Sequence, residues 1–279
     1  MRVTDVLIDL DYTLIDFSYG HGAAIQQLAR TYGVDFAAQF RLAFTTVLEA
    51  KRVQNGDWSS VRGGEAGYES LCSALRVLQG RGEWHPWSRE LYALHAAKLT
   101  QRSLTTTEVA TIATMYWKEV EQRSTVYPDV ADFLGRLDTK GIRYHIFTGS
   151  DARLAWNGQC WMYDPAYSRR LKMERLQVVA RVLAAYGLAP TSIITGDPLD
   201  KPDSIYYQRL VENVEQVTGH AFNPETSIAI GDSFIGDVQE PVRQLGLKAG
   251  YWLYRSSQHK RERLGSRQWK VGSLSQVPL

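Results

Sequence analysis

Residues 6–15 read Val6-Leu7-Ile8-Asp9-Leu10-Asp11-Tyr12-Thr13-Leu14-Ile15, and this stretch decides the fold. The apolar run that opens it predicts a fully buried strand. Asp9 and Asp11 are two residues apart, so they share one face where that strand ends. Two close carboxylates repel each other unless a cation lies between them or one takes a proton. The stretch therefore predicts a metal site, an acid/base pair or both, although a turn followed by a capped helix would contain the same residue types.

The overall composition is that of a globular protein. The chain has 279 residues, with 44% hydrophobic and 22% charged residues, which allows one large domain or two smaller ones. A net charge of +2 gives no electrostatic reason to expect a nucleic acid or a membrane as partner. Two cysteines imply no disulfide framework, and we find neither a signal peptide nor an apolar run that could cross a bilayer. These features predict a cytoplasmic protein.

A long helical block follows the first strand. Apolar residues recur at helical spacing over five segments, and no strand pattern interrupts them. We interpret 17–123 as a helical cap domain, inserted into an α/β core domain that consists of 1–16 and 124–279. The five expected helices are 23–32, 37–54, 65–78, 89–99 and 107–122.

From Tyr127 onward, strands and helices alternate, which favours a doubly wound parallel sheet. Helices are expected over 129–137 and from about Ser204. The basic stretch 255–267 is interpreted as a solvated surface loop. Further strands are expected at 142–147, 192–195, 227–230, 249–254 and 269–271.

Three later segments place polar residues where a predicted strand ends. Thr148-Gly149 follows the second strand, and glycine lets backbone N–H groups approach a phosphate while Thr148 adds a hydroxyl donor. Lys201-Pro202 precedes a helix, where a lysine can project its charge into a site. Gly231-Asp232 ends another buried strand, and Asp237 follows five residues later. Each segment alone is also typical of an ordinary turn or a surface lysine.

Together these four pieces resemble the motifs of the haloacid-dehalogenase superfamily. They occur in that family's order: Asp-x-Asp-x-Thr, then Thr, then Lys-Pro, then Gly-Asp-x-x-x-x-Asp. The resemblance covers nearly the whole chain, and the helical block resembles the cap that some members carry after the first motif. It implies an α/β Rossmann-like core and a phosphohydrolase that acts on a small phosphorylated metabolite, such as a nucleotide or a sugar phosphate.

The resemblance also implies roles for individual residues. Asp9 is the expected nucleophile, which forms an aspartyl-phosphate, and Asp11 is the expected general acid and base. Mg²⁺ is the expected cofactor, held at this site by Asp9, the Leu10 carbonyl, Asp11, Asp232 and Asp237, with Asp237 orienting either Lys201 or a metal-bound water. Phosphate contacts are expected from Thr13, Thr148, Gly149 and Lys201.

Several alternatives and departures stay open. A phosphomutase uses the same core residues, and a binding protein could keep the fold without catalysis. Dehalogenases of the family lack the second aspartate, so Asp11 argues against that activity. Tyr12 stands where glycine, asparagine or aspartate is more usual. Residues 150–174 form a longer, aromatic-rich segment, which could bind a protein partner.

Overall fold

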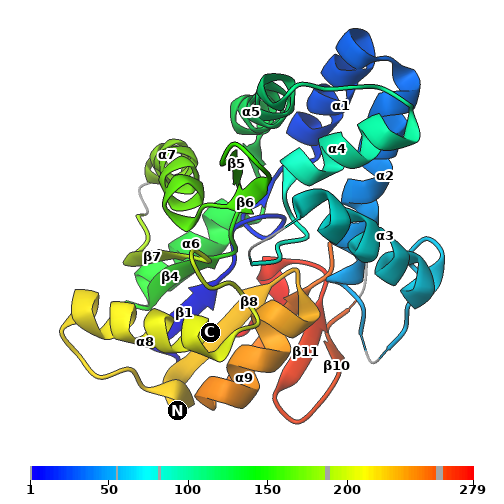
Figure 1. The fold of residues 1–279 in the computed structure, drawn as a ribbon. Coiled ribbons are helices and arrows are strands. Elements are labelled where there is room, and N and C mark those ends of the chain that lie inside the picture. The colour runs from blue at the N-terminus through cyan, green and yellow to red at the C-terminus, as the bar shows by residue number, and fades with distance from the viewer. Residues whose placement is uncertain (1, 55, 81–82, 186–188, 256–259) are drawn as a thin grey trace. The chain divides into compact units, whose positions relative to one another are not determined.

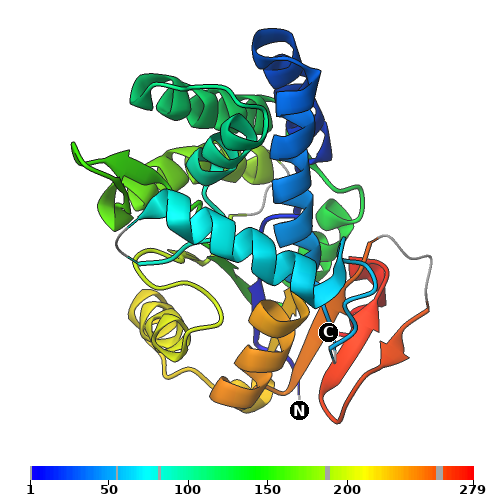
Figure 2. The same ribbon diagram turned by 45° about the vertical axis from the view of Figure 1, so that its right-hand side comes forward.

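A computed structural model describes residues 2–54, 56–80, 83–185, 189–255 and 260–279. The chain divides into two compact units (Figures 1 and 2). Unit 1 consists of Met1–Asp16, Thr125–Gly149 and Arg175–Leu279, and unit 2 consists of Phe17–Ser124 and Ser150–Glu174. Among the described residues, no helix combines the length and the apolar character needed to span a membrane.

Unit 1 is built on a seven-stranded sheet with the order β10-β11-β9-β8-β1-β4-β7, in which only the pairing of β10 with β11 is antiparallel. The chain moves from β1 outward to β4 and β7, then returns to the other side of β1 with β8 and β9. The prediction of a doubly wound α/β fold is therefore confirmed. The strands are β1 Asp5–Ile8, β4 Arg143–Thr148, β7 Ser192–Thr195, β8 Ser227–Gly231, β9 Ala249–Leu253, β10 Glu262–Arg263 and β11 Gln268–Val271.

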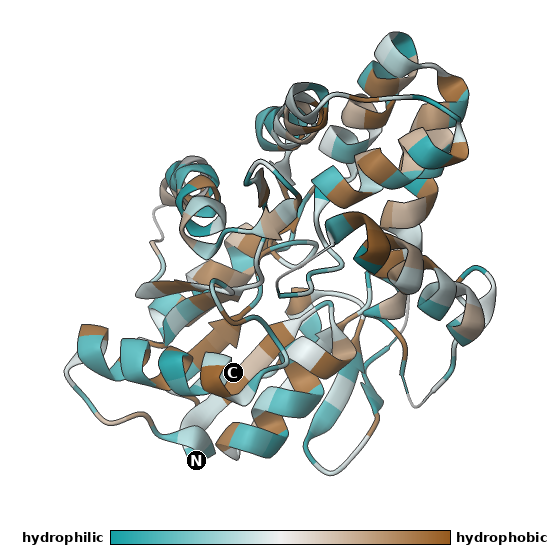
Figure 3. Cartoon of the chain, viewed as in Figure 1, coloured by the Kyte–Doolittle hydropathy of each residue, from teal (hydrophilic) through white to brown (hydrophobic). Residues whose placement is uncertain are grey.

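Apolar side chains on one face of this sheet pack against α8 and α9, as Figure 1 shows. Leu7, Phe147 and Ala229, from three adjacent strands, lie in one buried cluster with Tyr207 of α8 and Val242 of α9. Both faces of β1 are buried, which explains its uninterrupted apolar run, coloured brown in Figure 3. The helical elements of unit 1 are α6 Val130–Thr139, α8 Ser204–Thr218, α9 Glu240–Leu245, the π-helix η2 Phe234–Gln239, and the 3₁₀-helices η1 Pro224–Thr226 and η3 Leu274–Gln276.

Two short strands stand where the chain leaves and re-enters unit 1. β2 Ile15–Asp16 pairs with β3 Thr125–Val126 in antiparallel fashion. The two connections therefore run side by side, which ties the turn after Asp9 to the start of the second half of the core.

Unit 2 is mostly helical, as predicted for the block after the first strand. α1 packs closely on α5, because a side chain on Gly20 would come within 2.5 Å of the Val120 Cα atom. Thr105 and Glu108 form a capping box at the start of α5. The five helices are α1 Ser18–Tyr32, α2 Val34–Ala50, α3 Gly64–Gln79, α4 Arg89–Leu99 and α5 Thr106–Arg123.

The aromatic segment 150–174 belongs to unit 2 rather than to the core, where the sequence analysis placed it. It forms a hairpin of β5 Leu154–Trp156 and β6 Trp161–Tyr163 and then begins α7 Pro165–Ala184, a helix that the sequence analysis did not predict. Arg153 donates to Glu90 of α4 at 2.8 Å, and both side chains are buried. This ion pair joins the segment to the helical unit.

A buried ionic cluster lies where the strands of the sheet begin. Asp5 of β1 accepts two hydrogen bonds from the Arg143 guanidinium, at 2.8 and 2.9 Å, and a third contact of 3.1 Å joins it to His145. The other ring nitrogen of His145 lies 2.9 Å from the Ser192 hydroxyl. Burial alone would raise the pKa of Asp5, but the hydrogen bonds from His145, Arg143 and Thr4 outweigh it and hold that pKa well below its usual range.

We expect Asp5→Asn to lower the free energy of unfolding by about 2–4 kcal/mol at neutral pH, because it breaks a buried, hydrogen-bonded charge pair. The pKa of Asp5 is depressed in the folded state. Its stabilisation is therefore complete above the ordinary aspartate pKa and is lost as the pH falls below about 4. Urea unfolding at pH 7 and pH 3 measures both effects, and the difference between wild type and variant should shrink at pH 3.

The exposed Asp138 on α6 provides a matched control, and Asp138→Asn should change stability by less than about 0.5 kcal/mol. A difference between wild type and Asp5→Asn that stays constant from pH 7 to pH 3 would contradict the assigned role of the Asp5 carboxylate.

Candidate active site

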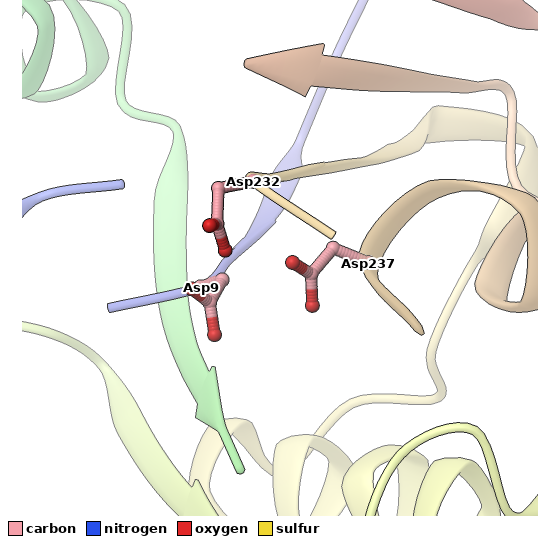
Figure 4. Close-up of side chains that lie close together, drawn as sticks. All are labelled: Asp9, Asp232 and Asp237. Atoms are coloured by element: carbon pink, nitrogen blue, oxygen red, sulfur yellow. The ribbon is translucent and has the colours of Figure 1, made fainter. Parts of the chain in front are cut away.

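The ends of four adjacent strands bring the predicted site residues to one edge of the sheet. Asp9 follows β1, Thr148 ends β4, Lys201 follows β7, and Asp232 follows β8. β1 is the strand from which the chain turns outward in both directions, and ligands of open α/β sheets bind at such a point. Asp9, Asp232 and Asp237 each offer a carboxylate oxygen within 4.8 Å of the others, and Figure 4 shows the three side chains converging.

Lys201 lies at the centre of this arrangement. Its ammonium group donates to Asp9 at 2.7 Å, to Asp237 at 2.6 Å and to the Phe147 carbonyl at 3.1 Å. Burial by itself would lower the pKa of Lys201, but the carboxylates of Asp237 and Asp9 raise it well above its ordinary value. The lysine therefore stays charged, and it orients the carboxylate of Asp9.

Asp237 is held by the backbone of the loop that carries it. Its second carboxylate oxygen accepts the Ser233 N–H at 2.8 Å, so one side chain bridges the loop after β8 and Lys201. A side chain on Gly231 would come within 2.3 Å of Asp237, so only glycine fits there. Of the two roles that the sequence left open for Asp237, the structure places it against Lys201.

Thr148 and Gly149 line the site as hydrogen-bond donors. Among the described residues, nothing bonds to the buried hydroxyl oxygen of Thr148. A Cβ atom on Gly149 would lie 3.1 Å from a carboxylate oxygen of Asp200, so a larger residue would crowd the acidic residue that precedes Lys201. Both observations fit a loop that receives an anion by its hydroxyl and backbone N–H groups.

The turn after Asp9 is closed by its own backbone. The Leu10 carbonyl accepts the N–H groups of Thr13, Leu14 and Ile15 at 3.3, 2.9 and 3.1 Å. These bonds use its acceptor capacity inside the turn, so the structure does not support the predicted role of this carbonyl as a metal ligand. The Thr13 hydroxyl donates to Asp9 at 3.3 Å, which places it on the nucleophile rather than directly on a phosphate.

Tyr12 has a φ of 61°, in the left-handed region. Glycine, asparagine and aspartate tolerate this region better than other residues, which explains why the family usually has one of them at this position. The bulky ring therefore stands on a strained backbone at the catalytic turn.

Asp11 lies outside the cluster of three carboxylates. Its side chain is paired with Arg175 of α7 through two contacts of 3.4 Å, one to each carboxylate oxygen. The structure thus brings Asp11 to a guanidinium rather than to Asp232 and Asp237, which does not support its expected part in metal binding.

The sequence analysis missed residues that hold these loops. Tyr206 donates to the Thr148 carbonyl at 3.3 Å, and Tyr207 donates to the Gly236 carbonyl at 2.6 Å, so neighbouring tyrosines of α8 fix two site loops. Arg255 donates to the Thr13 carbonyl at 2.7 Å and pairs with Asp129 at 3.0 Å. This arginine opens the segment 255–267 that we interpreted as solvated; residues 260–263 are exposed, and 256–259 lie outside the described residues.

The donor set suits a hard divalent cation. Three buried carboxylates within 4.8 Å of one another offer oxygen ligands of the type that Mg²⁺ prefers. One ammonium group among three carboxylates leaves an excess of negative charge, which a cation would offset.

Comparisons with known proteins agree with this geometry. The family model described as haloacid dehalogenase-like hydrolase matches residues 6–240, and the chain belongs to this family. No curated protein sequence matches the chain.

Solved structures share the fold at low sequence identity. A protein named as the HAD hydrolase YfnB from Bacillus subtilis, solved bound to magnesium, is 15% identical, with a TM-score of 0.60 over 99% of this chain and 96% of its own. The L-2-haloacid dehalogenase from Xanthobacter autotrophicus is 17% identical, with a TM-score of 0.52 over 92% and 80%. A protein named as a β-phosphoglucomutase from Thermotoga maritima is 15% identical, with a TM-score of 0.52 over 92% and 88%.

Proposed function

We propose that the protein is a Mg²⁺-dependent phosphohydrolase that cleaves a small phosphomonoester through an aspartyl-phosphate on Asp9. The observation that carries this proposal is the Asp9 carboxylate, buried and held by Lys201 at 2.7 Å beside two further acidic side chains. A buried carboxylate with a fixed direction is prepared for nucleophilic attack.

In the first step, a carboxylate oxygen of Asp9 forms a bond to phosphorus while the bond between phosphorus and the ester oxygen breaks. Asp11 donates a proton to the departing alkoxide, which leaves as an alcohol. In the second step, Asp11 takes a proton from water, and the water oxygen attacks phosphorus. The bond between Asp9 and phosphorus breaks, which releases inorganic phosphate and restores the carboxylate.

The other site residues hold the phosphoryl group during both steps. The free hydroxyl of Thr148 and the backbone of Gly149 supply hydrogen-bond donors, and the Lys201 ammonium supplies positive charge. Mg²⁺, held by Asp9 and Asp232 with Asp237 nearby, would neutralise charge on the carboxylates and on the phosphoryl oxygens.

The test is phosphate release from p-nitrophenyl phosphate, followed by a panel of nucleotides and sugar phosphates. We expect turnover with Mg²⁺, a loss of at least about 100-fold after treatment with EDTA, and recovery when Mg²⁺ is added back. Binding of Mg²⁺ should also raise the melting temperature, since a ligand that binds only the native state stabilises it.

Chloride release from 2-chloropropionate serves as the contrasting assay. Expulsion of a halide requires neither a phosphate site nor protonation of a leaving alkoxide, so the donors around Thr148 and the presence of Asp11 favour the phosphate reaction. Chloride release without any phosphate release would overturn the proposal, and so would absence of turnover on the whole panel with Mg²⁺ bound.

A further inference from the structure

The carboxylate of Asp11 is gripped at two points by a buried arginine. The two terminal nitrogens of Arg175 each lie 3.4 Å from a different oxygen of Asp11. The Arg175 side chain is 4% exposed and the Asp11 side chain 24% exposed, so the arginine is the fixed member of the pair. A planar guanidinium that meets both oxygens of a carboxylate defines the plane of that carboxylate, which a lysine cannot do.

The turn that carries Asp11 keeps its shape without this arginine. Within the turn, Tyr12 donates to the Ile15 carbonyl at 2.9 Å and Leu14 donates to the Leu10 carbonyl at 2.9 Å. Arg255 holds the Thr13 carbonyl from outside. The backbone is therefore fixed by other groups, and the orientation of the Asp11 side chain is what remains for Arg175 to set.

We propose that Arg175 is a positioning residue, which orients the Asp11 carboxyl toward the oxygen of the leaving group. This inference rests on the proposed phosphohydrolase function, and it deepens the account of the same site. The contacts are longer than the 2.6 Å bond between Lys201 and Asp237, so they orient the carboxylate while leaving it free to exchange a proton with the substrate. General acid catalysis depends on that orientation.

The leaving group provides the test. p-Nitrophenolate departs readily without a proton, whereas the alkoxide of glycerol phosphate needs one. We expect Arg175→Gln to lower kcat/KM for glycerol phosphate by about 10- to 100-fold and for p-nitrophenyl phosphate by less than about 3-fold. The specificity constant is the right quantity because it reports the step in which the leaving group departs.

Three further variants sharpen the result. Asp11→Asn should give the same selective loss, and the double variant should lose little more than either single variant, since both act through one group. Arg175→Lys keeps the charge but not the two-point contact, so it should recover at most a small part of the selective loss. The exposed Arg181, on the same helix and in the same unit, supplies the control Arg181→Gln, which should leave both constants unchanged.

The outcomes separate the two proposals. A wild-type protein that hydrolyses neither ester overturns the phosphohydrolase function, and this inference with it. A wild-type protein that hydrolyses both, with equal losses on the two esters in Arg175→Gln, overturns the positioning role alone, as does full recovery in Arg175→Lys. Thermal unfolding of each variant verifies folding, and Arg175→Lys carries the same test if Arg175→Gln does not fold.

Discussion

Asp9→Asn should reduce the turnover of p-nitrophenyl phosphate by about 10⁴-fold or more, because an amide cannot take the place of a carboxylate nucleophile. Loss of activity should come without loss of the fold. Lys201 keeps its bonds to Asp237 and to the Phe147 carbonyl, and the repulsion among three carboxylates within 4.8 Å is reduced. We therefore expect the metal-free variant to unfold within about 1 kcal/mol of wild type, since a site built for function is commonly strained. Steady-state kinetics and urea unfolding measure the two effects.

A lost metal ligand could also explain inactivity, so a second measurement isolates the nucleophile. Rapid acid quenching with labelled substrate should leave phosphate on the wild-type protein and none on Asp9→Asn. Asp11→Asn should still acquire the label, because p-nitrophenolate departs without a proton, and should lose it slowly. Label on the Asp9→Asn protein would show that another residue is the nucleophile, and the exposed Asp138 again supplies the control substitution, Asp138→Asn.

The meeting of Asp9, Thr148, Lys201 and Asp232 could be predicted because it depends on a general property of parallel sheets. Each residue follows or ends a strand with a strong apolar pattern, and parallel strands place their carboxyl ends at the same edge. Buried strands and their order along the chain are local features of the sequence. The site inherits that predictability.

Arg175 could not be found in this way. The buried side of α7 carries Ser168, Lys172 and Arg175 at helical spacing, so polar residues stand where an amphipathic helix normally has apolar ones. Lys172 is buried against Asp151 at 2.9 Å, just as Arg175 is against Asp11. An ion pair between residues distant in sequence leaves no periodic trace, and for that reason the helix, its unit and its contact with the site were all missed.

The Leu10 carbonyl failed for a different reason. A sequence shows that a backbone oxygen exists but not which way it points. Here three N–H groups of the same turn claim it. Tyr12 shows the reverse case, because its departure from the usual residue types was visible in the sequence, while its cause, a left-handed φ of 61°, required the structure.

Gly231→Ala should be the most damaging substitution that adds a single methyl group near the site. The new Cβ atom would lie 2.3 Å from Asp237, well inside van der Waals contact, so the carboxylate must move. Movement breaks its bonds to Lys201 at 2.6 Å and to the Ser233 N–H at 2.8 Å. We expect a loss of about 2–4 kcal/mol in the free energy of unfolding and about 100-fold or more in kcat, measured by urea unfolding and by phosphate release.

The same substitution at Gly135 of α6 should act in the opposite direction. Nothing lies within 4 Å of a Cβ atom built there, and its backbone is helical, so Gly135→Ala should raise stability by about 0.5–1 kcal/mol without changing kcat. If Gly231→Ala acts through the carboxylate, adding it to Asp237→Ala should remove little further activity, because both changes disable one group. Independent losses in that double variant would instead mean that Gly231 serves the site by some route other than the space it leaves for Asp237.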